Sequence, residues 1–288
     1  MDQAQRLRQL LTINKNADKK HSSIKVITIS SGKGGVGKTN IAVNLGLGLI
    51  QKGFRVAILD GDLGMANVNV MLGLKCTYTI YDVLYENKHI DEIIYSSPEG
   101  LKIISGGSGI SELLNLSTIA AEKLIEEFAR LKDIDILIVD TGAGASQLVL
   151  DFIKAADRAI VVTNPEPTAL TDAYGLIKVI TKEGFNTKLS LIVNKAINIK
   201  DAREAFTRLS HSIEFFLKTK IEYLGYVCDD SKVMRSVRNQ VPFIIGYPNC
   251  EASLCIKNIC SELVGDGSKS KNTSMVDFIS RILHTVVR

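Results

Sequence analysis

The 288-residue sequence contains no tryptophan and only five prolines, and aromatic residues make up 6% of it. No apolar stretch approaches the ~20 residues that a helix needs to cross a bilayer. The first ten residues, MDQAQRLRQL, are too charged for a secretory signal. Membrane spans and a signal peptide are therefore not expected, and the sequence predicts a cytoplasmic protein.

The five cysteines include no CxxC pair. Cys250, Cys255 and Cys260 are spaced five residues apart, so on a helix each would be turned by about 140° from the one before. Side chains in that arrangement cannot share a metal ion, and we interpret the cysteines as reduced structural thiols. An iron–sulfur carrier would need a closely placed cysteine pair, which the sequence does not offer.

The remaining composition is that of a globular domain. Hydrophobic residues make up 45% of the chain, and a single large α/β domain is favoured over two domains at this length. The net charge is only +4, which gives no argument for nucleic acid as a partner.

Short β-branched runs alternate with longer helical patterns along the chain. Continuous apolar strands separated by helices predict a three-layer α/β fold, with a mostly parallel sheet covered by helices on both faces. Such a sheet binds ligands at the carboxyl ends of its strands. The expected strands are residues 24–29, 55–59, 101–104, 134–139, 159–163, 188–193 and 223–227.

The octapeptide GKGGVGKT at residues 32–39 lies between the first expected strand and a helical pattern at residues 40–51. All four fixed positions of the phosphate-loop pattern GxxxxGK[ST] match, in the strand, loop and helix order that a P-loop requires. A glycine-rich turn without a ligand is the alternative, and this context disfavours it.

The physical chemistry of the octapeptide explains how it would hold phosphate. Its glycines can adopt backbone conformations closed to other residues, so that consecutive N–H groups turn inward around phosphate oxygens at the positive end of the following helix. Lys38 would reach the β- and γ-phosphates, and Thr39 would offer its hydroxyl to Mg²⁺. The predicted binding residues are Gly32, Lys33, Gly34, Gly35, Val36, Gly37, Lys38, Thr39 and Asn40.

Acidic residues end two further expected strands. RVAILD ends in Asp60, with Asp62 two residues later, and IDILIVD ends in Asp140. An isolated acid at a strand end is more often a cap or a turn residue, but two of them downstream of a P-loop favour metal and water roles. We predict that Thr39, Asp60 and Asp140 hold Mg²⁺ and that the glycines after Asp140 move when the γ-phosphate is present.

The second lysine of GKGGVGKT, the DGD at residues 60–62 and the DTGAG at residues 140–144 resemble the MinD/ParA class of ATPases, which has a deviant Walker A motif. The resemblance implies ATP and Mg²⁺ as cofactors and an ATP-dependent homodimer, in which Lys33 reaches the partner's nucleotide. It also implies that Asp62 positions the attacking water, so that Lys33, Lys38 and Asp62 are the expected catalytic residues. Hydrolysis would release the dimer, giving a slow switch.

Base recognition is less well marked. Asn194 follows the strand LSLIV at a position where this class reads the adenine edge, and the loop containing Asp230 would close over the base in the same way. A buried asparagine at a strand end is often only a turn residue, and that alternative stays open.

Three stretches of the chain and its first residues resemble the flagellar-number regulators FlhG and FleN, called YlxH in some bacteria. DQAQRLR at residues 2–8 resembles their DQAxxLR element. DGDLGMANVNVMLG, TNPEPTALTDAYGLIK and LGYVCDDSKVMRSVRNQVPF are similar to stretches of the same subfamily, so that the resemblance covers nearly the whole chain. Asn69 and Cys228 depart from it, since aspartate and proline are usual there, but neither touches the predicted phosphate chemistry.

Residues 1–22 are interpreted as a binding helix with a polar tether. A helix of about ten residues is marginal alone and would fold on a partner. The resemblance implies that this element activates FlhF, an SRP-type GTPase; a frayed terminus or a helix docked on its own domain is the alternative. The predicted partner contacts are Asp2, Gln3, Ala4, Leu7 and Arg8.

The other end of the chain carries MVDFISRILHTVVR after a polar stretch at residues 265–274. A tethered amphipathic helix with basic residues can bind an anionic membrane reversibly. Most amphipathic helices instead cover the core of their own domain. Membrane binding and core covering are compatible if the helix lies in a groove of the monomer and ATP-driven dimerisation frees it. The predicted membrane face comprises Phe278, Ile279, Ile282, Leu283 and Val286.

The chain is thus divided into an FlhF-activating segment (1–22), a MinD-like ATPase domain (23–264) and a linker with a membrane-targeting helix (265–288). The resemblance implies a regulator of flagellar number and placement at the inner face of the cell membrane, at the pole, with flagellar C-ring proteins and a flagellar transcriptional activator as further partners. A ParA-type DNA partition ATPase is the alternative, for which Lys232, Arg235 and Arg238 are candidate DNA contacts.

Overall fold

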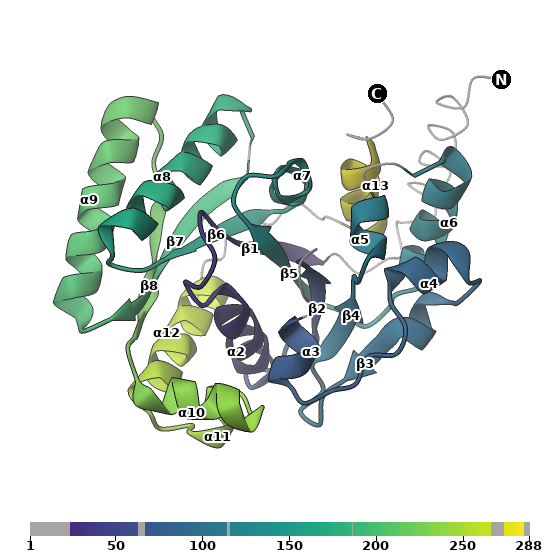
Figure 1. Cartoon of the computed structure of the whole chain (residues 1–288), viewed down its shortest axis with the longest axis horizontal. Helices are drawn as coiled ribbons and strands as arrows, with labels where there is room; N and C mark the ends of the chain where they lie inside the picture. The colour runs from purple at the N-terminus through teal and green to yellow at the C-terminus, as the bar shows by residue number, and fades with distance from the viewer. Residues whose placement is uncertain (1–23, 63–66, 114–115, 186, 266–273, 285–288) are drawn as a thin grey trace.

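The computed structural model of the chain describes residues 24–62, 67–113, 116–185, 187–265 and 274–284. The described strands form one eight-stranded sheet in the order β3-β4-β2-β5-β1-β6-β7-β8 (Figure 1). All neighbouring pairs are parallel except β3 with β4. The strands are β1 Lys25–Ser31, β2 Val56–Gly61, β3 Ile94–Ser96, β4 Lys102–Ser105, β5 Ile136–Ala143, β6 Arg158–Thr163, β7 Lys188–Ala196 and β8 Glu222–Cys228. The predicted α/β fold with a mostly parallel sheet is confirmed.

The edge strand β3 is the one element of the sheet that the sequence did not predict. It has three residues, and it pairs antiparallel with β4 through Ile94 opposite Ile104. A strand this short has no apolar run or alternation for a sequence pattern to detect. It covers the sheet edge beyond β4 and contributes no residue to the predicted site.

Helices cover both faces of the sheet (Figure 1). One face packs against α2, α11 and α12, and the other packs against α4, α6, α7 and α13 at one end and α7, α8 and α9 at the other. The helices are α2 Lys38–Ile50, α3 Asn67–Met71, α4 Ile80–Tyr85, the 3₁₀ helix η2 Ile90–Ile93, α5 Gly109–Glu112, α6 Thr118–Ala129, α7 Gln147–Ala155, α8 Pro167–Lys182, α9 Ile199–Leu217, α10 Ser231–Asn239, α11 Phe243–Gly246, α12 Glu251–Gly265 and α13 Met275–His284.

Helix α2 is buried on nearly all sides between the sheet and α12. Its glycines allow this close packing: a β-carbon on Gly48 would lie 2.7 Å from the Cys260 sulfur. A helix enclosed in this way needs apolar residues all round, which is why its sequence shows little amphipathic pattern. Its burial fixes the loop before it, where the predicted phosphate site begins.

The helix predicted near the C-terminus is α13, and it lies against α6 and α7. The Ser274 hydroxyl accepts a hydrogen bond from the Asp277 N–H and so caps the helix. The predicted membrane residues Phe278, Ile279, Ile282 and Leu283 are at most 2% exposed. In this structure, then, the apolar face of α13 covers the domain's own core.

Two groups of predicted residues lie outside the described part of the chain. They are the FlhF contacts Asp2, Gln3, Ala4, Leu7 and Arg8, and the membrane residue Val286. Among the helices that are described, none combines the length and the apolar character that crossing a bilayer requires.

Candidate nucleotide-binding site

The phosphate loop joins β1 to α2 at the carboxyl edge of the sheet. Gly37, the residue before α2, has a φ of 92°, and the first turn of α2 has neither a capping side chain nor an acidic residue. The N–H groups at that end of the helix are left for an external acceptor, and the helix dipole favours an anion there. The geometry therefore matches a phosphate site.

The four glycines of the loop have different roles. Gly35 and Gly37 have φ values of 78° and 92°, which residues with a β-carbon rarely adopt. A β-carbon on Gly32 would lie 2.1 Å from the backbone of Asp172, so Gly32 is required for packing against α8. Gly34 has neither constraint. The expectation that all four provide backbone freedom was wrong for Gly32 and Gly34.

Lys38 and Asp140 form a buried ion pair in the structure. The Lys38 Nζ lies 2.9 Å from the Asp140 Oδ1, and the two side chains are 8% and 0% exposed. Burial raises the pKa of Asp140, whereas Lys38 and a hydrogen bond from the Thr39 hydroxyl favour its ionised form. A bound phosphate would therefore meet a lysine already held in position by β5.

Asp60 lies beside Asp140 because β2 and β5 are neighbours in register. Its carboxylate accepts hydrogen bonds from the N–H groups of Val68 and Asp62, at 3.2 and 3.3 Å. Burial, with the charge of Asp140 adding to it, raises the pKa of Asp60 to about 6. Two buried acids placed together in this way need a cation to be ionised together.

The residues present fit a Mg²⁺ ion. The Asp140 Oδ2 is buried and has no hydrogen-bond partner among the described residues. In those same residues no group of three or more His, Cys, Asp and Glu side chains could hold a metal. Mg²⁺ needs only one or two carboxylates, because waters and the nucleotide phosphates complete its shell. Thr39, Asp60 and Asp140 would hold it there, and the ion would neutralise charge on the phosphates.

The raised pKa of Asp60 predicts a pH dependence for metal binding. Since its carboxylate is neutral below about pH 6, the gain in nucleotide affinity from Mg²⁺ should be complete above that pH. It should fall by up to about tenfold per pH unit below it. Titrating ADP affinity with and without Mg²⁺ between pH 5 and 8 measures this gain, and the nucleotide's own titration is removed by repeating the series with Asp60→Asn. Equal pH profiles in the two proteins would contradict the assignment.

Asp62 follows β2 and is half-buried beside β5. Its Oδ1 lies 3.6 Å from where a β-carbon on Gly142 would be, so that it faces the DTGAG sequence on the neighbouring strand. The Gly144 N–H in turn donates to the carbonyl oxygen of Ser31 at the start of the phosphate loop. The structure thus brings together the loop and both acidic sequences that the motifs predicted.

Lys33 does not point toward the other site residues. Its Nζ donates to the Glu166 carboxylate and to the Thr168 hydroxyl, each at 3.0 Å, at the start of α8. The bond to Lys33 lowers the pKa of Glu166. This pair is exposed to solvent, where ion pairs are weak and screened by salt, so that a stronger anion can draw Lys33 away.

A cavity of about 280 Å³ adjoins the phosphate loop. Asn194 lies at its wall, and its side-chain amide donates to the Val36 carbonyl oxygen at 2.7 Å. The same amide has a second N–H and a carbonyl oxygen for the edge of a base. The lining includes Asn40, Val227, Cys228, Met234 and Val237, from α2, β8 and α10. A partly apolar wall that also carries the amides of Asn40 and Asn194 suits a planar base.

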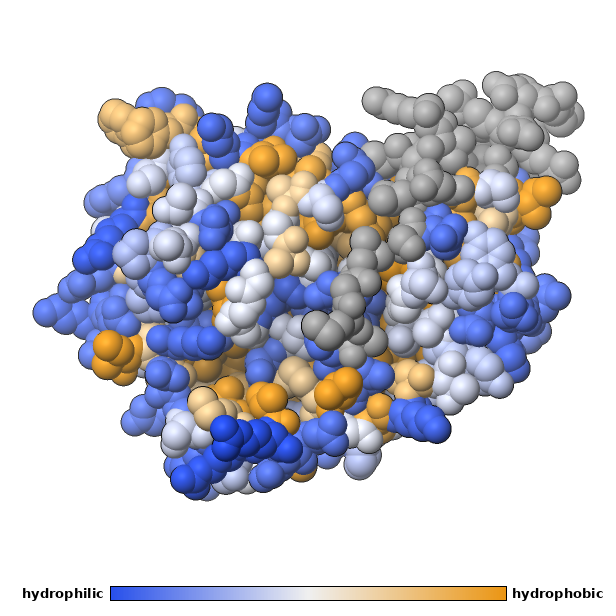
Figure 2. Space-filling view, viewed as in Figure 1, coloured by the Kyte–Doolittle hydropathy of each residue, from blue (hydrophilic) through white to orange (hydrophobic). Residues whose placement is uncertain are grey.

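Asp230 also lines this cavity, but its carboxylate is used within the chain. It accepts a hydrogen bond from the Lys232 N–H at 2.9 Å and caps α10. Its role in binding a base remains a prediction. Met234 and Val237 of α10 are exposed, on the helix that also carries the basic residues of the DNA-binding alternative. Over α10, Figure 2 shows apolar surface directly beside hydrophilic surface.

Sequence reasoning missed two residues that contact the loop and its lysine. Lys195 has a φ of 55°, and its Nζ donates to the Gly35 carbonyl oxygen at 3.0 Å. Glu166 holds Lys33 as described above. Lys195 directly follows Asn194, and Glu166 lies in the TNPEPT sequence. Neither sequence pattern, however, predicts which residue of the phosphate loop the side chain will contact.

The described cysteines are free thiols. Cys228 on β8 and Cys255 on α12 lie close to each other, a proximity that the spacing of the cysteines did not predict. Burial, with Cys255 adding to it, raises the pKa of Cys228 to about 12, so that its thiol stays protonated and is a poor metal ligand.

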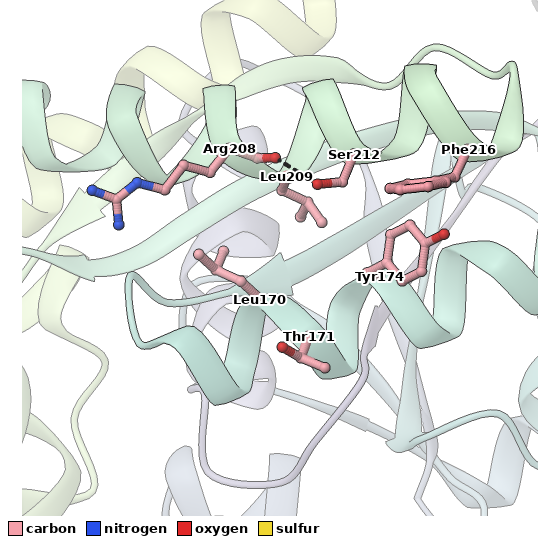
Figure 3. A pocket seen from close by; sticks show the side chains of 7 residues that line it. All are labelled: Leu170, Thr171, Tyr174, Arg208, Leu209, Ser212 and Phe216. Atoms are coloured by element: carbon pink, nitrogen blue, oxygen red, sulfur yellow. Dashed lines mark hydrogen bonds between the residues drawn. The ribbon is translucent and has the colours of Figure 1, made fainter.

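A second cavity, of about 370 Å³, lies between α8 and α9, and no residue of the phosphate loop lines it (Figure 3). Leu170, Tyr174, Leu209 and Phe216 form most of its wall, and the Ser212 hydroxyl donates to the Arg208 carbonyl oxygen beside it. It contains no carboxylate and no glycine loop, so the nucleotide site is the one at the sheet edge.

The sequence matches one family model and is similar to two flagellar proteins. Residues 23–264 match the model of the ParA family, described as NUBPL iron-transfer P-loop NTPase. The chain is 36% identical over 241 residues to the antiactivator FleN of Pseudomonas aeruginosa, covering 83% of this chain and 86% of that protein. It is 35% identical over 267 residues to the flagellum site-determining protein YlxH of Helicobacter pylori, covering 91% and 90%.

Solved structures show the same architecture. The septum site-determining protein MinD of Pyrococcus horikoshii, complexed with Mg-ADP, has a TM-score of 0.67 at 25% identity, covering 86% of this chain and 99% of that one. MinD in the MinC:MinD cell division complex of Aquifex aeolicus has a TM-score of 0.67 at 25% identity, with 86% and 98% covered.

Proposed function

The chain belongs to the ParA family of P-loop NTPases and is an ATPase that uses ATP and Mg²⁺, and we propose that it regulates the number and placement of flagella. The observation that carries this proposal is the similarity to FleN and YlxH, which extends over more than four-fifths of the chain. The phosphate loop and the acidic turn at residues 60–62 lie within the residues that match the family model. Plasmid partition proteins of Borrelia burgdorferi share the fold at 22% identity, below the 36% and 35% of FleN and YlxH.

In the proposed cycle ATP joins two copies of the chain. Lys38 holds the β- and γ-phosphates, and Asp62 orients the water that attacks the γ-phosphate. Lys33 would leave Glu166 and reach the nucleotide of the second copy, where phosphate oxygens offer more charge than one exposed carboxylate. Hydrolysis removes that anion, Lys33 returns to Glu166, and the dimer separates.

We propose that the dimer binds the inner face of the cell membrane through α13, while the protein is otherwise cytoplasmic. Exposing a buried apolar side chain costs about 1.5–3 kcal/mol, and the described part of α13 buries six: Met275, Val276, Phe278, Ile279, Ile282 and Leu283. Release into water alone is therefore unfavourable. An anionic bilayer would accept the same face and restore most of that free energy, so that release and membrane binding occur together.

We propose a separate role for each of the three segments of the chain. Residues 1–22 would bind the GTPase FlhF through Asp2, Gln3, Ala4, Leu7 and Arg8. Residues 23–264 would form the ATPase domain, and residues 265–288 would provide the linker and the membrane helix. Flagellar C-ring proteins and a flagellar transcriptional activator are the further partners that we propose, with action at the cell pole.

A peptide of residues 1–20 should stimulate GTP hydrolysis by FlhF, and the same peptide with Gln3→Ala should lose that stimulation. The expected loss arises because a short helix that folds on its partner depends on each polar contact in the interface. Steady-state GTP turnover measures both peptides, and a peptide with Gln9→Ala, outside the predicted contacts, is the matched control. Absence of stimulation by the native peptide would leave an ATPase with a different target, and salt-dependent retention of DNA by the ATP-bound chain would then indicate partition.

A further inference from the structure

Helix α7 begins just after the DTGAG sequence at residues 140–144. The Ser146 hydroxyl caps α7 by accepting from the Val149 N–H, and Ser146 stands two residues after Gly144. Gly144 is hydrogen-bonded to Ser31, the last residue of β1 before the phosphate loop. A movement of the DTGAG sequence when the γ-phosphate binds would therefore be passed directly to the start of α7.

Phe152, in the middle of α7, packs under the acidic turn at residues 60–62. A β-carbon on Gly61 would lie 3.1 Å from the Phe152 Cε2, so that the ring edge lies directly against the backbone between Asp60 and Asp62. The ring is fully buried. The ring therefore packs against the backbone that carries both carboxylates, and Phe152 is not itself a predicted phosphate or metal ligand.

The other side of Phe152 faces α13. Its ring stacks on that of Phe278, with 6.4 Å between the centroids and 18° between the planes. At the end of α7 the Arg281 guanidinium donates to the Ala155 carbonyl oxygen at 3.1 Å, where a cation complements the helix dipole. Helix α13 therefore holds α7 both at Phe152 and at its C-terminus.

We propose that Phe152 is a positioning residue that links the acidic turn of the ATPase site to the docking of α13. Packed interiors change between discrete arrangements and do not deform smoothly, so that a shift of Gly61 must displace the ring, and the ring must displace Phe278. This inference rests on the proposed release of α13: the contact of Phe152 with Phe278 is the one through which ATP binding causes that release. Because coupling is reciprocal, loss of docking must also change nucleotide affinity.

Of the two helices against which α13 packs most extensively, only α7 leads to the acidic turn. Helix α13 also packs against α6, but α6 carries none of the residues predicted at the nucleotide site. Phe152, by contrast, contacts Gly61 on one side and Phe278 on the other. One side chain therefore contacts both the acidic turn and α13.

Hydrogen exchange of the α13 amides in the full-length chain tests the proposal. In the native protein a non-hydrolysable ATP analogue should raise exchange about five- to a hundredfold relative to ADP, the usual range of coupling between sites. With Phe152→Leu the two nucleotides should give exchange rates within about twofold of each other. Ile153→Ala is the matched control, since this equally buried neighbour faces α8 and α9, and it should retain the native difference.

The outcomes separate the two proposals. If ATP and ADP give equal exchange in the native protein, the release of α13 fails and the inference fails with it. If the nucleotides differ in the native protein and differ as much in Phe152→Leu, release stands but Phe152 does not transmit it.

Phe278→Ala tests the link from the other end and leaves the packing of α7 on the sheet in place, should Phe152→Leu not fold. The affinity of Phe278→Ala for the ATP analogue should be higher than that of the native protein. The factor should equal the increase in α13 hydrogen exchange that the analogue causes in the native protein, and the affinity for ADP should stay unchanged. An unaltered ratio of the two affinities overturns the proposal.

Discussion

Replacing Lys38 by methionine is expected to abolish nucleotide binding and also to destabilise the nucleotide-free protein by about 3–5 kcal/mol, the usual cost of removing one partner of a buried ion pair. Lys38 is 8% exposed, and the fully buried Asp140 lies 2.9 Å from it. Methionine fills similar volume but leaves the Asp140 charge unpaired. Urea unfolding followed by circular dichroism measures the loss, since the chain has no tryptophan to report by fluorescence.

The double variant Lys38→Met/Asp140→Asn is the control for this effect. It removes the unpaired charge, so that most of the stability should return, whereas nucleotide binding should remain absent because the phosphate ligand is still missing. Burial already raises the pKa of Asp140. Without Lys38 that carboxyl should take up a proton more readily, and the destabilisation by Lys38→Met should therefore shrink as the pH is lowered. Equal urea midpoints for Lys38→Met and the native chain would show that the pair does not stabilise the fold.

Asp62→Ala is expected to lower the rate of ATP hydrolysis by about 10²–10⁴, the range for loss of a group that handles the attacking water. ATP affinity should stay close to the native value, because Asp62 lies outside the Lys38–Asp140 pair and is not a predicted phosphate ligand. The ATP-bound dimer should then persist. Phosphate release under single-turnover conditions measures the first effect, and sedimentation with anionic vesicles in the presence of ATP measures the second.

Lys33→Ala separates hydrolysis from dimerisation in the same assays. It should bind ATP as a monomer and fail to sediment with vesicles, whereas Asp62→Ala should sediment more completely than the native chain. A rate within tenfold of native for Asp62→Ala would mean that another group positions the water, and Asp60 would be the nearest carboxylate.

The sequence predicted the seven long strands, the phosphate loop and the amphipathic helix at the C-terminus because each is specified within a short window. Apolar runs, a glycine pattern and a helical period all depend on neighbours a few residues apart. The resemblance to the FlhG and FleN regulators likewise depended on contiguous motifs, and the comparisons confirmed it. The short strand β3 has no such local pattern, and it was missed.

The sequence by itself determined what the site binds, because the chemistry of phosphate and Mg²⁺ requires particular side chains in a fixed local order. Only the tertiary structure decided which of those side chains meet. Asp60 adjoins Asp140 because β2 lies beside β5, Lys33 pairs with a residue 133 positions away, and Phe152 separates the acidic turn from α13. Strand order and helix packing set these distances. That arrangement minimises the free energy of the whole chain, and a local sequence pattern contains no information about it.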